Sequence, residues 1–433
     1  MLKAILTKID ELQHPRRLVF GIALAAAFVM TFVIWRNQSA VAQTDDPYGF
    51  FRFGQGIAEG RGLAQLEHPE LPTTRRAPLY PGIIALLYVL GGPYTVVVRV
   101  LQCFLAAGTA TLTFGIGRRM FSQRVGFFAS MACAFHPMVL RYVPDIQVEC
   151  LLQFFTTLMV WCGVCFFQKP TAGMGAALGA AGALGALTKG VLVICPPIFA
   201  VFWLLRRLKR RESLTIVPVA AIALAMCVVI LPWTARNYHV TGKFMLISSN
   251  ASGEFLRGFV FAQPKYFLLE KRAFEHGENE ANQMQTELFA ARGLVWSRDE
   301  METERVHNEI YREQWRGDPV GMFKKTVVKT VIGTFAFWYV LTTKLNSLVV
   351  GALALGAWLL SLYGWVEARK RGLVLWPLLQ PILSLNLLYA FMLALGRYSA
   401  PAIPTLMVLA SWGLFCLLER LAGPKHGALA KAA

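Results

Sequence analysis

Residues 97–119, VVRVLQCFLAAGTATLTFGIGRR, decide the fold class of this chain. Residues 97–117 are mostly apolar and long enough to cross a bilayer, since a spanning α-helix needs about 20 such residues. Arg118 and Arg119 follow at once. Because Lys and Arg at the end of an apolar run mark the cytoplasmic side, the stretch predicts a membrane-spanning helix whose carboxyl end faces the cytoplasm.

The composition of the whole chain extends this interpretation. Of its 433 residues, 56% are hydrophobic and 16% are charged, whereas soluble domains average about 45 to 50% apolar and about 25% charged residues. An ordinary soluble enzyme is therefore excluded. The net charge of +18 comes from Lys and Arg clusters that end apolar runs, so we interpret it as an orientation signal and expect no nucleic-acid partner.

The length of apolar runs and the cytoplasmic placement of Lys and Arg clusters together predict about ten membrane-spanning helices, in a range of 9 to 13. They lie near residues 18–35, 97–117, 125–142, 150–167, 172–187, 189–205, 214–234, 345–366, 374–395 and 401–419. With the amino end inside, every major basic cluster is cytoplasmic, and so are both termini. Two shorter apolar segments, 79–92 and 326–342, are expected to be re-entrant or interfacial helices on the outer face. The Gly/Ala-rich run 172–186 is suited to close helix packing.

The predicted fold is an all-α polytopic membrane protein with a small helical periplasmic cap. Residues 1–234 form an amino-terminal transmembrane module that includes a first outer loop at 36–96. Residues 235–344 form the periplasmic cap, and residues 345–433 form the carboxyl-terminal transmembrane helices.

Two carboxylates stand alone between Leu71 and Arg211. Asp145 and Glu149 are four residues apart, on one face if the stretch is helical. Acidic residues at the edge of the hydrocarbon are costly and indicate function by default. The alternative is that both face water at the outer interface.

The first outer loop adds the adjacent acids Asp45 and Asp46. Two carboxylates held together can provide a general base or bind a divalent ion such as Mg or Mn, although Asp-Asp-Pro is also an ordinary turn sequence. The outer face also carries Arg75, Arg76, Arg99, Arg236, Arg257 and Arg397. Arginine pairs well with phosphate, so acids and arginines together indicate a phosphorylated lipid substrate; ordinary anionic headgroups are the other possible partners of these arginines.

Several stretches resemble one known family. They are DDPYGFFRFGQGIAEGRGL (45–63), RRAPLYPGIIALLYVLGG (75–92), FHPMVLRYVPDIQVECLL (135–152), LGALTKG (184–190), LPWTARNYHVTGKFMLISSNASGEFLRG (231–258) and GRYSAPAIP (396–404). In this order they are similar to motifs of the membrane-embedded GT-C glycosyltransferases, in the bacterial branch akin to protein O-mannosyltransferases and the lipid A aminoarabinose transferase. Lys189 stands where that family usually has Arg.

The resemblance implies a sugar donor linked to a polyprenyl phosphate and an inverting transfer at the periplasmic face of the bacterial inner membrane. Asp46 then takes the position of the catalytic base, with Asp45 beside it and Glu149 as the second acid. The substrate-binding candidates are Tyr48, Arg76, Tyr80, Arg99, Asp145, Trp233, Arg236, Asn237, Arg397 and Tyr398. The acceptor is a lipid, a glycan or a protein, membrane lipids surround the chain, and no metal is assigned except a divalent cation on Asp46 as an option.

Two other functions fit the same residues. A transporter or flippase for lipid-linked sugars also needs outer arginines and a lipid groove but no base. A non-catalytic scaffold in envelope-glycan assembly keeps the fold alone.

Overall fold

The computed structural model describes residues 2–37, 49–213, 215–249, 251–261, 273–293, 300–336, 345–394 and 396–422. The helices are α1 (Leu2–Asp10), α2 (Pro15–Asn37), α3 (Phe50–Ala58), α4 (Leu79–Gly91), α5 (Thr95–Met120), α6 (Gln123–Ala134), α7 (Pro137–Arg141), α8 (Glu149–Gln168), α9 (Ala172–Thr188), η1 (Gly190–Ile194), α10 (Cys195–Lys209), α11 (Val217–Thr241), α12 (Ala251–Phe261), α14 (Ala273–Ala290), α15 (Glu300–Gly317), α16 (Pro319–Ala336), α17 (Leu345–Lys370), α18 (Trp376–Phe391), η2 (Gly396–Ala402) and α19 (Ile403–Ala422). Over these ranges the chain is helical without strands, as predicted.

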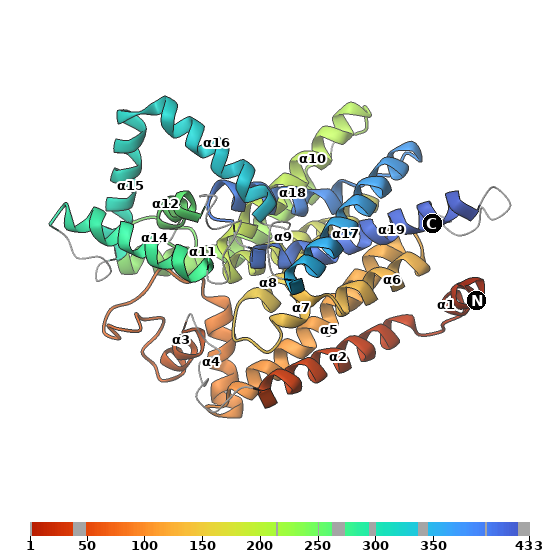
Figure 1. Cartoon of the computed structure of the whole chain (residues 1–433), viewed down its shortest axis with the longest axis horizontal. Helices are drawn as coiled ribbons and strands as arrows, with labels where there is room; N and C mark the ends of the chain where they lie inside the picture. The colour runs from red at the N-terminus through yellow and green to blue at the C-terminus, as the bar shows by residue number, and fades with distance from the viewer. Residues whose placement is uncertain are drawn as a thin grey trace.

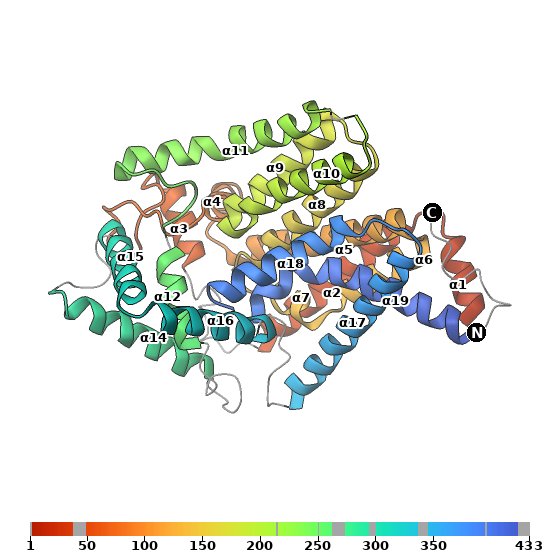
Figure 2. The ribbon, with the colours of Figure 1, turned by 90° about the horizontal axis from the view of Figure 1, so that it is seen from above.

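Most of the long apolar helices form a bundle, and a second group of helices gathers at one end of it. Figures 1 and 2 show α3, α12, α14 and α15 at this end, which we call the cap end. Helix α1 and the carboxyl end of α19 lie at the opposite end (Figure 1). The described parts of the predicted cap are thus helical and lie together.

Seven helical segments are long and apolar enough to cross a membrane within the described ranges. They are Pro15–Ile34, Thr95–Met120, Glu149–Gln168, Gly190–Lys209, Val217–Thr241, Gly351–Lys370 and Arg397–Leu421. Many of their large apolar side chains are exposed, for example Leu224 at 67% and Leu359 at 59%. Such surfaces are stable against lipid tails and not against water. The chain is therefore a multi-pass membrane protein.

The predicted count of ten spans is not reproduced among the described residues. The single span expected at 125–142 is wrong, because the helix ends at Ala134 and α7 begins at Pro137. Proline lacks the amide donor that a continuing helix needs, and the Nδ1 atom of His136 instead accepts from Met138 N at 3.2 Å. Helix α4 has 13 residues and is too short to span, as expected.

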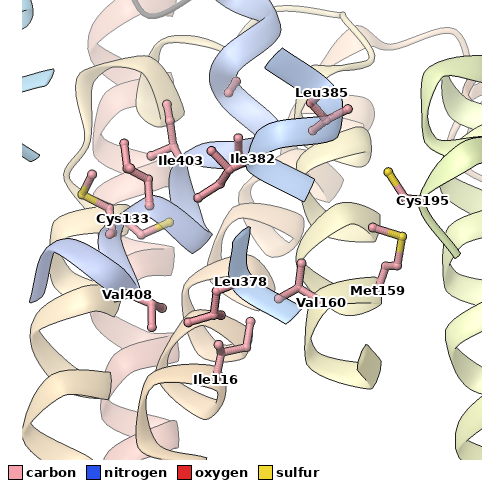
Figure 3. Close-up of a cluster of buried hydrophobic side chains, with 14 of the residues drawn as sticks. Ile116, Cys133, Met159, Val160, Cys195, Leu378, Ile382, Leu385, Ile403 and Val408 are labelled. Atoms are coloured by element: carbon pink, nitrogen blue, oxygen red, sulfur yellow. The ribbon is translucent and has the colours of Figure 1, made fainter. Parts of the chain in front are cut away.

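One main apolar core joins the bundle helices. Figure 3 shows Ile116 of α5, Val160 of α8, Ile382 of α18 and Val408 of α19 among its buried side chains. All four are at most 2% exposed. Helices far apart in the sequence therefore share one packed interior, and α18 and α19 are held against α5 and α8.

Helix α9 packs closely against α11 through glycines. A Cβ atom on Gly175 would lie 2.1 Å from Pro218 O, and one on Gly179 would lie 2.3 Å from Ile222 O. Figure 2 shows the two helices side by side. The Gly/Ala-rich run 172–186 therefore serves tight packing, as its composition indicates.

We predict that Gly179→Ala destabilises the protein by about 1 to 3 kcal/mol, because the new methyl group meets backbone that cannot give way. Gly173→Ala is the matched control in the same helix, since nothing lies within 4 Å of its added Cβ. Alanine is the better helix former by about 1 kcal/mol, so the control should be neutral or stabilised. The midpoint of thermal unfolding in detergent measures both; equal midpoints would contradict the close packing of α9 on α11.

Candidate active site

Glu149 is a buried carboxylate at the amino end of α8. Its side chain is 4% exposed, and its Oε2 atom has no hydrogen-bond partner among the described residues. The amide groups of a first helical turn favour negative charge, which partly offsets the cost of burying a carboxylate. The side chain thus keeps an oxygen available for a further partner.

A hydrogen-bonded turn fixes the start of α8. Gln102 Nε2 in α5 donates to Val143 O at 2.7 Å and to Asp145 O at 2.8 Å. Tyr80 Oη in α4 donates to Gln102 Oε1 at 2.7 Å. All four residues precede Glu149, so α4 and α5 together set where its carboxylate lies.

The position of Asp145 differs from that of Glu149. Asp145 is half-buried in the turn before α8, whereas Glu149 is the first residue of that helix. The two acids therefore do not share a helical face. The idea that both simply face water fails for Glu149, because its side chain is buried.

Lys189 and Arg397 supply positive charge near Glu149. Lys189, between α9 and η1, interacts electrostatically with both. Its Nζ atom lies 3.7 Å from the ring centroid of Tyr398 and 5.3 Å from that of Tyr389. Arg397 Cζ lies 5.1 Å from the Tyr398 centroid. We call these five residues the charged cluster.

The two tyrosines form the aromatic wall of this cluster. Tyr389 of α18 and Tyr398 of η2 are stacked, with centroids 4.4 Å apart and planes at 23°. A desolvated cation over an aromatic face gains about 2 kcal/mol, so the wall stabilises Lys189 where water cannot. The uncharged side chains thereby help to keep a cation inside the protein.

A side-chain amide holds η2 beside α8. Gln153 lies one turn after Glu149, and its Nε2 donates to Ala400 O at 2.7 Å.

Glu254 of α12 also interacts electrostatically with Lys189. Helix α12 of the cap therefore contributes a charge to the same region.

Two predicted phosphate-binding arginines donate to backbone carbonyls. Arg99 Nε donates to Pro144 O at 3.0 Å. Arg236 Nη1 donates to Thr73 O at 2.9 Å, and its Nη2 donates to Leu63 O at 3.0 Å. These bonds show that both arginines hold backbone segments; contact with a donor phosphate stays a prediction for them.

The Pro-Trp-x-x-Arg-Asn motif fastens the end of α11 to the segment that follows it. Trp233 Nε1 donates to Ile247 O at 2.8 Å, and Asn237 Nδ2 donates to the same oxygen at 3.1 Å. The Arg236 guanidinium also lies over the Trp233 ring, with Cζ 4.7 Å from its centroid. The motif thus holds the end of α11 against residues 245–247; substrate binding by Trp233 and Asn237 stays a prediction.

A second buried carboxylate joins the cap to the first outer loop. Glu300 of α15 accepts from Thr74 N at 2.7 Å and from the hydroxyl of Thr73. Ser249 N donates to Thr74 O at 3.0 Å, and Arg75 Nε lies 3.9 Å from Glu300 Oε1. The loop, the residues after α11 and the cap therefore meet at one point.

The first outer loop is described only in part. Asp45, Asp46 and Tyr48 lie outside the described residues, so their predicted roles stay predictions. Phe50 begins α3 and packs edge to face on Tyr80, with centroids 5.3 Å apart. Arg76 Cζ lies 5.5 Å from the Phe50 ring centroid.

The structure thus brings together three predicted residues, namely Glu149, Arg397 and Tyr398. Sequence reasoning left Lys189, Tyr389 and Glu254 out of the candidate site. Lys189 carried a usable signal, because a single cation between two apolar segments marks function in a membrane protein. Among the described residues no three His, Cys, Asp or Glu side chains are grouped to hold a metal ion, and Asp46, the candidate ligand, is not among them.

We predict that Glu300→Gln loosens the cap from the first outer loop. The Glu300 carboxylate accepts hydrogen bonds with both of its oxygens, whereas the glutamine amide has only one acceptor oxygen. At least one buried hydrogen bond is therefore lost, which costs about 1 to 3 kcal/mol. Hydrogen exchange at the Thr74 amide should therefore accelerate about tenfold or more. Glu302→Gln is the control, since that carboxylate is exposed and pairs with Arg305; equal exchange in both variants would contradict the role of Glu300.

The chain is similar to one protein family in sequence and to solved structures in fold. Residues 75–233 match the family model described as dolichyl-phosphate-mannose-protein mannosyltransferase. Searching the curated proteins gives no match to the chain. The crystal structure of ArnT from Cupriavidus metallidurans bound to undecaprenyl phosphate is similar at 17% identity and a TM-score of 0.41, covering 90% of this chain and 77% of ArnT. The apo state of ArnT gives 18% identity, the same TM-score, and coverage of 90% and 76%.

The matched residues 75–233 run from α4 through most of α11. They include Tyr80 and Gln102, which hold the turn before α8, and two of the five residues of the charged cluster, Glu149 and Lys189. This part of the chain is therefore similar to a family of glycosyltransferases.

Proposed function

We propose that the chain transfers a sugar from a polyprenyl-phosphate donor to an acceptor hydroxyl at the periplasmic face of the inner membrane, with inversion. Asp46 is the general base, and the charged cluster receives the donor. The acceptor is a lipid, a glycan or a protein. One observation carries the proposal: the buried carboxylate of Glu149 lies with Lys189 and Arg397 at the cap end of a membrane bundle.

The donor class is supported by the family match. Dolichyl-phosphate-mannose, in the description of the matched family, is a sugar on a polyprenyl phosphate. Such a donor needs cations for its phosphate and an apolar path for its chain. Lys189 and Arg397 offer the cations, and cations directed at a phosphate stabilise the charge that develops as it leaves.

The chemistry needs few groups. The acceptor oxygen forms a bond to the anomeric carbon, and the bond from that carbon to the phosphate oxygen breaks. The acceptor proton passes to the Asp46 carboxylate, and the polyprenyl phosphate leaves with its electron pair. Attack opposite to the leaving phosphate inverts the anomeric centre, and one positioned base contributes about 10²- to 10⁴-fold.

The periplasmic side is supported by the distribution of charge. Arg118 and Arg119 end α5, and Arg124 at the start of α6 pairs with Asp10 of α1 at 2.5 Å. Helix α1 lies at the end away from the cap (Figure 1). Because basic clusters mark the cytoplasm, this arrangement supports cytoplasmic termini and a charged cluster in the periplasmic half.

We predict that Asp46→Asn lowers sugar transfer by at least about 100-fold, because the amide cannot accept the acceptor proton. Binding of undecaprenyl phosphate, the probe for the donor site, should stay within about threefold of wild type. The assay follows transfer from a panel of undecaprenyl-phosphate sugars by mass spectrometry. Glu287→Gln, an exposed carboxylate in α14, is the control. Wild-type transfer by Asp46→Asn would refute the assigned base, and movement of the lipid-sugar across vesicles without transfer would favour a flippase.

We predict that Lys189→Met weakens the binding of undecaprenyl phosphate by about tenfold or more, since a hydrogen bond to a charged group contributes about 1.5 to 3 kcal/mol. Methionine keeps a side chain of similar length without the charge. Lys169→Met is the matched control. Lys169 lies just before α9 and Lys189 just after it, but Lys169 is exposed. Titration of the detergent-solubilised protein measures both affinities; unchanged binding by Lys189→Met would remove Lys189 from the donor site.

A further inference from the structure

The cap contains a cavity separate from the charged cluster. It has a volume of about 740 Å³ and lies among α12, α14, α15 and α16. Figures 1 and 2 show the first three of these helices at the cap end, with α16 leading from it toward the bundle. Its apolar walls come from Leu256, Phe259, Met284, Leu288, Met322 and Val328. The volume falls in the range of about 300 to 1,000 Å³ that small-molecule sites occupy.

One buried cation lines this cavity. Lys329 of α16 is 2% exposed, and its Nζ atom lies 3.3 Å from the ring centroid of Phe255 and 4.1 Å from that of Phe259. Nζ also donates to Phe255 O at 3.3 Å. Over the described ranges, no carboxylate pairs with it. Burial lowers the pKa of Lys329 to about 7, which reflects the cost of a cation without a counter-ion.

Two further lysines stand at the rim. Lys324 and Lys325 line the cavity and are exposed. The carboxylate at the rim, Asp318, accepts from Gly321 N at 2.8 Å and so caps the start of α16. The cavity is therefore lined by three lysines and by one carboxylate, which is already hydrogen-bonded to the backbone. This excess of positive charge favours an anionic ligand.

The outer face of α16 is suited to a membrane surface. Val320, Phe323, Val327 and Val331 are 44 to 64% exposed, and their spacing puts them on one face of the helix. Lysines beside such an apolar face are typical of helices that lie in the membrane interface. A lipid in the adjoining leaflet thus has a short path to the cavity.

We propose that this cavity binds a phosphate-bearing lipid drawn from the membrane, with its phosphate at Lys329 and its hydrocarbon against the apolar walls. Inorganic phosphate gains nothing from those walls, and a neutral lipid gains nothing from the lysines. The inference does not depend on the proposed transfer reaction. The proposed lipid would bind on the other side of α12 from the charged cluster. Glu254 of α12 interacts with Lys189 of that cluster, and Leu256 of the same helix lines the cavity.

The test uses the full chain in detergent and dioctanoyl phosphatidic acid as the probe, followed by native mass spectrometry and calorimetric titration. Wild type should bind phosphatidic acid at least tenfold more tightly than dioctanoyl phosphatidylcholine or inorganic phosphate. Lys329→Met should weaken phosphatidic acid binding at least tenfold. Lys370→Met is the matched control, because Lys370 is exposed in α17 and pairs with Glu367; its affinity should equal that of wild type.

A second variant tests the walls without altering charge. Leu288→Trp fills the cavity from α14 and should weaken phosphatidic acid binding at least tenfold with all three lysines in place. Equal binding by wild type and both cavity variants would overturn the proposal, as would equal affinity for phosphatidic acid and phosphatidylcholine. Binding of inorganic phosphate as tight as that of the lipid would show a simple anion site and overturn it too. Binding of undecaprenyl phosphate through Lys189 is measured separately, so failure here is distinguishable from failure of the proposed function.

Discussion

The structure depends on keeping one negative and two positive side chains together inside a membrane bundle. Glu149 is buried beside Lys189 and Arg397, and charges taken out of water are tolerated only when opposite charges or dipoles surround them. Each partner comes from a different part of the chain. The start of α8, the junction of α9 and η1, and η2 must therefore meet for any of these charges to be stable. This electrostatic requirement ties together three segments that lie far apart in the sequence.

Neutral hydrogen bonds supply the positions that electrostatics alone does not fix. Gln102 binds two successive parts of the turn before α8, and Gln153 binds the backbone of η2. Charge attraction is weakly directional, whereas these amide bonds have defined lengths and angles. The side-chain amides of Gln102 and Gln153 thus fix the positions of Glu149 and Arg397.

Much of the fold follows from the sequence because hydropathy and length decide which segments are helical. The short helix at α4 and the packing of α9 were both predictable in this way. The break at His136 was missed because residues 125–142 are mostly apolar, and hydropathy does not register a single proline. In the site, Glu149 was predictable as an isolated acid. The carbonyl partners of Arg236 were not, since they lie at Leu63 and Thr73, more than 150 residues earlier.

Helix α12 links the two charged regions of the cap end. Glu254 interacts with Lys189 of the cluster, and Phe255, the next residue, contacts Lys329 of the cap cavity. Phe255 also packs on Phe391 at the end of α18, with centroids 5.0 Å apart, close to Tyr389 of the aromatic wall. A Cβ on Gly258 would lie 1.8 Å from Met392 O, so α12 fits against the end of α18 without room for even a methyl group. A displacement of α12 toward either region must therefore move charges in both, and the cap cannot be rearranged independently of the charged cluster.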